Sequence, residues 1–154
     1  MPSKNDSVRT ARREIAHYLR AQTAPLQRAI EGQRQCFTAL PALHSQATDG
    51  QNAATAARAR ALGRTYAPLF RDCLAQVEEL RAPPSAIRCQ EYMARWLKAL
   101  INAADSLVNA PEDGRDVTYL RDCHDFLDDA RYAVKPLTEI RQLLYEAAKG
   151  PPKH

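Results

Sequence analysis

The amino-acid sequence predicts an all-α protein, an up-down-up-down antiparallel four-helix bundle whose long helices are kinked by proline. Three observations predict this fold. Alanine is abundant and glycine is scarce, with 5 glycines in 154 residues, a balance that favours helix because alanine loses the least entropy there. Apolar residues recur at spacings of three and four along four long segments. Short turn signals separate these segments, as is typical of antiparallel neighbours in a bundle.

Length and composition fit one domain. A chain of 154 residues can bury a continuous core, and 45% hydrophobic with 26% charged residues is near the average for soluble globular proteins. No stretch approaches the run of about 18 apolar residues that a transmembrane helix requires. We expect residues 7–149 to form the bundle, with disordered tails at residues 1–6 and 150–154.

The first helix is predicted from about Ser7 to Leu43, with Asp6 or Ser7 as its N-cap. A loop containing Thr48-Asp49-Gly50 follows, from His44 to Asn52. The apolar and amide residues at helical spacing, which predict the buried face, are Ile15, Leu19, Gln22, Leu26, Ile30, Gln33, Phe37 and Leu40.

The second helix is predicted from about Asn52 to Arg81, where Pro83-Pro84 ends it. The third helix starts there and ends before the turn Pro111-Glu112-Asp113-Gly114. Asp116 is a candidate cap for the last helix, which reaches about Lys149. The predicted buried stripe of this last helix is Val117, Leu120, Cys123 or His124, Leu127, Val134, Leu137, Ile140 and Leu144.

Pro25, Pro68 and Pro136 lie inside helical patterns, where each should remove one hydrogen bond and kink its helix. Counted from the Thr48 loop, all three lie roughly 24 to 30 Å along the bundle. The simplest interpretation is that each kink curves a helix around the core, and Thr23 is an alternative start for a separate fifth helix. A second interpretation is that the kinks together open a small cavity, whose candidate lining is Tyr18, Tyr66, Tyr92, Met93 and Trp96.

Each of the four predicted helices carries one cysteine. Cys36 and Cys123 lie at one predicted height, and Cys73 and Cys89 lie at another. Because the Cα atoms of a disulfide must lie within roughly 7 Å, these heights predict the bridges Cys36–Cys123 and Cys73–Cys89. Buried free thiols and a two-cysteine metal site with a histidine remain as alternatives, whereas a single four-cysteine zinc site conflicts with the two heights.

Disulfides would place the protein in an oxidising compartment. The N-terminus has no apolar region of a signal peptide, which points instead to the cytoplasm. We therefore expect a periplasmic or secreted protein, with its signal absent from this sequence, if the bridges form, and a cytoplasmic protein otherwise.

No residue pattern predicts an enzyme, a metal site or a cofactor. Glu14 and His17 have the spacing of one half of a di-metal site, but the second copy is missing. The aspartates from Asp122 to Asp129 are expected on an exposed face near a helix N-terminus. A haem held by Met93 and His17 is unsupported by any further motif.

By elimination, the sequence predicts a noncatalytic interaction or binding module. Its expected partner is a protein or a small apolar ligand, contacted by the outer helix faces or by the cavity. A small-ligand or haem sensor is one alternative. Weak polyanion binding through the arginines of the first helix is another, but no motif for nucleic-acid recognition is present.

Overall fold

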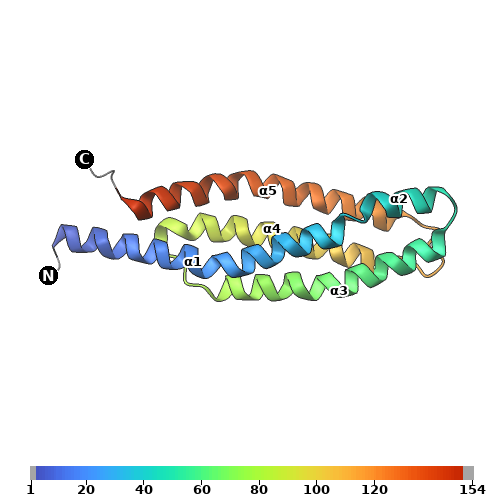
Figure 1. Ribbon diagram of the computed structural model, residues 1–154, viewed down its shortest axis with the longest axis horizontal. Helices are drawn as coiled ribbons and strands as arrows, with labels where there is room; N and C mark the ends of the chain where they lie inside the picture. Colours follow the sequence, from blue (N-terminus) through green and yellow to red (C-terminus); the bar gives the residue numbers. More distant parts are fainter. Residues whose placement is uncertain (1–2, 151–154) are drawn as a thin grey trace.

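The computed structural model describes residues 3–150, which form five α-helices and one short 3-10 helix. These elements are α1 (Lys4–Phe37), α2 (Leu40–Thr48), α3 (Asn52–Glu79), η1 (Pro84–Ala86), α4 (Ile87–Val108) and α5 (Thr118–Lys149). Helices α1 and α2 run in one direction, α3 returns, α4 reverses again and α5 returns, so that both chain ends lie at the same end of the molecule (Figure 1). The predicted all-α four-helix bundle is confirmed, with α1 and α2 together as its first rod.

The first helix differs from the prediction at both ends. It begins at Lys4, because the hydroxyl of Ser3 accepts a hydrogen bond from the amide of Asp6 at 3.2 Å and caps the helix. Residues 4–6, expected in a disordered tail, are therefore helical, while residues 1–2 and 151–154 lie outside the described residues. The helix ends at Phe37 rather than Leu43, and residues 44–48 of the expected loop belong to α2. Pro41 explains this second start, because proline is tolerated in the first turn of a helix.

The core is formed by one apolar face of each long helix. Helix α4 is the central element, since it packs extensively against both α3 and α5, whereas α1 packs more lightly against α3 and α5. The largest fully buried side chains include Trp96, Tyr18, Phe70, Leu19 and Leu43. Within residues 3–150 no helix combines the length and the hydropathy needed to cross a bilayer.

The three interior prolines lie inside continuous helices, Pro25 in α1, Pro68 in α3 and Pro136 in α5. The predicted separate helix at Thr23 is therefore wrong. The three prolines also do not share one level along the bundle. A Cβ built at Gly32 of α1 would lie 2.9 Å from Leu69, so Pro68, the residue before Leu69, lies near Gly32. Gly32 is seven residues, or about 10 Å, from Pro25 along α1. The error arises because the heights were counted from a first helix ending at Leu43, whereas α2 continues the first rod to Thr48 and so places Pro25 about five residues further from that end.

All four cysteines are buried free thiols, so the disulfides Cys36–Cys123 and Cys73–Cys89 are not formed in the structure. Cys36 and Cys123 nevertheless lie close enough to influence each other: burial raises the pKa of the Cys36 thiol, and the nearby Cys123 raises it further. The second predicted pair is out of register. Gln90, next to Cys89, donates to the carbonyl of Val77 at 3.2 Å, and Val77 lies four residues, about 6 Å, from Cys73 along α3.

Candidate binding groove

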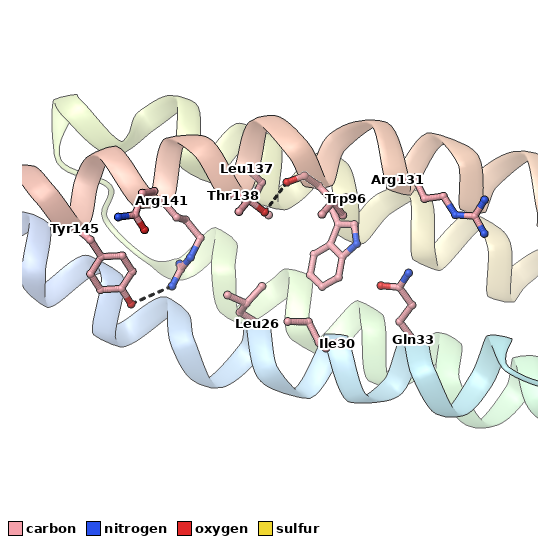
Figure 2. Close-up of a pocket in the computed structure, with 11 residues that line it drawn as sticks. Leu26, Ile30, Gln33, Trp96, Arg131, Leu137, Thr138, Arg141 and Tyr145 are labelled. Carbon is pink, nitrogen blue, oxygen red and sulfur yellow. Dashed lines mark hydrogen bonds between the residues drawn. The ribbon is translucent and has the colours of Figure 1, made fainter.

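A groove of about 550 Å³ separates α1 from α5. Leu26 and Ile30 project into it from α1, Val134 and Leu137 line it from α5, and the indole of Trp96 on α4 forms its floor (Figure 2). The polar residues of its lining are Gln33, Arg131, Thr138, Arg141, Gln142 and Tyr145. The groove is thus an apolar slot with an arginine near each end.

Two wall residues that the apolar spacing predicts to be buried lie instead beside the core, next to the buried Ala29 and Ala133. Ile30 belongs to the apolar stripe that predicts the inner face of α1, and Val134 belongs to that of α5, yet they are 43% and 39% exposed. Their neighbours along the same stripes, Leu19 and Leu137, are 1% and 4% exposed. The same stripes are therefore buried at these neighbouring positions and leave apolar side chains uncovered at Ile30 and Val134.

Trp96 is the single tryptophan of the chain and is 2% exposed. Its Nε1 is buried and has no hydrogen-bond acceptor among the described residues. A buried N–H without an acceptor is unusual, because its desolvation is not compensated. The floor of the groove is therefore the small accessible part of an almost fully buried indole, whose buried N–H has no acceptor among the described residues.

A polar network lies at one end of the groove. The fully buried Gln22 is its centre: its Oε1 accepts from Nη1 of Arg141 and, at 3.6 Å, from the thiol of Cys89. Its Nε2 donates to the hydroxyl of Tyr18 at 3.0 Å, and Tyr18 donates to Oε1 of Gln90 at 3.4 Å. These bonds connect α1, α4 and α5 at one level of the bundle.

The network holds no compensating negative charge for Arg141. Burial raises the pKa of Tyr18 well above its usual range, more than the nearby guanidinium lowers it, so the phenol stays neutral. Burial likewise raises the pKa of Cys89 against the opposing influences of Gln22 and Arg141. Arg141 is half-buried, and the second of its donors reaches only the hydroxyl of Tyr145, at 3.4 Å.

The arginine at the other end has a different environment. Arg131 donates to a carboxylate oxygen of Asp128 at 3.1 Å, and its side chain is 70% exposed. Beyond it, a second hollow of about 650 Å³ shares Ile30, Gln33 and Arg131 with the groove and continues toward α2. The opening between α1 and α5 is therefore elongated along the bundle.

Of the five residues predicted to line a cavity, Trp96 alone lines this groove. Tyr18 is buried in the polar network, Met93 is fully buried, and Tyr66 is half-buried and donates to Gln35 at 3.2 Å. Tyr92 is half-buried on α4 and is not part of the groove lining. The candidate haem ligands do not meet there either, because His17 is exposed on α1 and Met93 is enclosed in the core.

Neither Arg141 nor the gap between the groove walls was predicted from the sequence. Helical spacing predicted Ile30 and Val134 to be buried, and this is wrong, because both lie at a gap between α1 and α5 and are 43% and 39% exposed. On α5, ligand atoms of His124, Asp125 and Asp128 lie within 4.8 Å of one another. His124 and Asp125 are exposed and His124 pairs with Asp128 at 3.5 Å, as surface charges on one helix turn commonly do.

Comparison with known proteins adds no assignment to this geometry. No protein-family model, no curated protein and no solved structure matches the chain.

Proposed function

We propose that this protein is a noncatalytic binding module that holds a small, mostly apolar ligand in the groove between α1 and α5. The observation that carries the proposal is the exposure of Ile30 and Val134, which flank the buried Ala29 and Ala133, on opposite walls of a groove of about 550 Å³. Ligand sites are typically concave, mostly apolar and roughly 300–1,000 Å³ in volume. Apolar side chains left uncovered on facing walls are typical of a surface that a ligand completes.

The gain from filling the groove follows from the exposed fractions. Burying a large aliphatic side chain completely contributes about 1.5–3 kcal/mol. Since about two fifths of Ile30 and of Val134 is uncovered, a ligand that covers both gains about 1 kcal/mol from each, besides its contacts with Trp96. The ligand also buries its own apolar surface, and each methylene group adds about 0.8 kcal/mol.

The test uses Trp96 as the reporter. We expect the fluorescence of this single tryptophan to change on titration with a ten-carbon amphiphile, 1-decanol or decanoate, at monomeric concentrations. Val134→Asp places a charge on the wall and should weaken binding by about tenfold or more, because covering a carboxylate with an apolar ligand removes it from water. Leu143→Asp is the matched control: Leu143 lies on the same helix, is 64% exposed and does not line the groove.

Equal losses of affinity in Val134→Asp and Leu143→Asp would contradict binding in the groove. Failure of both amphiphiles to bind the unaltered protein would overturn the proposed function. Saturation only by an amphipathic peptide helix would assign the groove to a protein partner instead of a small molecule.

A further inference from the structure

We infer that the ligand of this groove is a single-chain carboxylate whose head group pairs with the guanidinium of Arg141. The inference rests on the proposed function and adds the chemical class of the ligand. Its starting point is a half-buried cation at the end of an apolar slot (Figure 2).

Arg141 has no carboxylate partner among residues 3–150. The cations that form ion pairs there are Arg28, Arg34, Arg71, His124 and Arg131. Arg141 donates only to the amide oxygen of Gln22 and the hydroxyl of Tyr145, and its Cζ lies 5.7 Å from the centre of the Tyr145 ring. All of these partners are neutral, so the positive charge remains uncompensated.

The guanidinium also retains unused donors. It carries five N–H groups in a planar fork, and the two bonds above occupy one on each terminal nitrogen. A carboxylate matches this fork geometry and forms charge-assisted hydrogen bonds that are stronger than neutral ones. Gln22 holds the fork in place, because Gln22 is itself fixed by its 3.0 Å bond to Tyr18.

The second arginine does not offer an equivalent site. Arg131 is already paired with Asp128 and is largely exposed, so water and a carboxylate compete with any ligand for it. The charge of the groove is therefore asymmetric, with the free cation at the Arg141 end. An amphiphile would place its head there and extend its chain past Leu137 and Ile30 over Trp96.

The experiment compares decanoate with 1-decanol, which share the chain and differ in the head group. We expect the unaltered protein to bind decanoate about tenfold or more tightly at pH 7.5, the ratio that one charge-assisted hydrogen bond contributes. Arg141→Gln should bring the ratio of the two affinities to about one, and this ratio within the variant, not either affinity alone, is the readout. Arg131→Gln is the matched control and should retain the preference.

Gln22→Glu provides a second variant that keeps Arg141. A carboxylate at position 22 would neutralise the guanidinium from within the protein, so decanoate should lose its advantage over 1-decanol. Circular dichroism verifies that each variant is folded. If a variant unfolds, the affinities of the unaltered protein for decanoate and 1-decanol still test the carboxylate assignment.

Equal affinities for decanoate and 1-decanol in the unaltered protein would overturn the carboxylate assignment while leaving the proposed function intact. Loss of the preference in Arg131→Gln, with its retention in Arg141→Gln, would overturn the assignment to Arg141. Failure of both compounds to bind would instead refute the proposed function itself.

Discussion

Alanine in place of Gly63 (Gly63→Ala) is expected to destabilise the bundle, although the same exchange stabilises most helices. Gly63 is buried in α3 where this helix meets α4. A Cβ built there would lie 2.6 Å from the carbonyl oxygen of Ala104, 2.8 Å from the amide nitrogen of Val108 and 2.7 Å from its Cγ2. Two of these three atoms belong to the backbone, so relief of the clash requires α3 and α4 to move apart.

The expected magnitude is the balance of two opposing effects. Alanine at an unobstructed helix position gains about 1 kcal/mol over glycine. Overpacking a tight interface costs about 1–3 kcal/mol, and the upper part of that range applies because backbone atoms are the obstacle. We expect a net loss of about 1–2 kcal/mol in the free energy of unfolding, or a fall in Tm of about 3–8 °C for a chain of this length.

Urea unfolding followed by circular dichroism and by Trp96 fluorescence measures this loss. Gly32→Ala is the matched control, since its Cβ would meet only side-chain atoms, Leu69 Cδ2 at 2.9 Å and Phe70 Cε1 at 3.1 Å. Leu69 is half-buried and can rotate, so this control should lose less stability than Gly63→Ala. A Gly63→Ala variant more stable than the unaltered protein would refute the close approach of α3 and α4.

Two further predictions concern α5 and the buried thiols. Pro136→Ala should restore a backbone hydrogen bond within α5 and raise the free energy of unfolding by about 1–3 kcal/mol, so a lower Tm by calorimetry would contradict the helical setting of Pro136. Burial raises the pKa of Cys36, helped by Cys123, and that of Cys123 itself from 9.0 to about 12. Because folding favours the neutral thiols, their contribution to stability is complete below pH 9.0 and is lost as pH rises toward 12. Urea unfolding from pH 8 to about pH 12 should show this loss of stability. When Cys36 and Cys123 are both replaced by alanine, the free energy of unfolding should fall less steeply with pH. An equally steep fall in the double variant would contradict the attribution of the loss to these two thiols.

The long helices were predictable because each carries a stripe of apolar residues at helical spacing. Such a stripe indicates an amphipathic helix from the local sequence alone, without knowledge of its partners. The break between α1 and α2 was missed although Pro41 signals it. Proline disfavours helical geometry in the residue before it but suits the first turn of a new helix. The sequence pattern continues through Phe37 and Leu40 on both sides of the break, so periodicity alone does not reveal it.

The site was less predictable because it depends on contacts between residues far apart in the sequence. In the sequence, nothing distinguishes Arg141 from the many surface arginines. Its partner Gln22 is 119 residues away in the chain, so only the folded structure shows that the two side chains meet. The cysteine heights had a similar weakness. The predicted heights placed Cys36 near Cys123, as the structure does. In the α3–α4 hairpin, however, the two helices are shifted by a few residues relative to the predicted register, so Cys73 and Cys89 lie at different heights.

The topology explains why the chain does not close its own groove. No loop joins α1 to α5, so side chains alone bring these two helices together. Two of these contacts, Gln22 with Arg141 and Cys36 near Cys123, are 14 residues or about 21 Å apart along α1. Pro25 and Pro136 lie on the stretches of α1 and α5 near and between these contacts, where each removes one hydrogen bond from its helix. Leu26 and Leu137, the residues that follow the two prolines, line the groove, so the opening coincides with the stretch where each of the two helices lacks one backbone hydrogen bond.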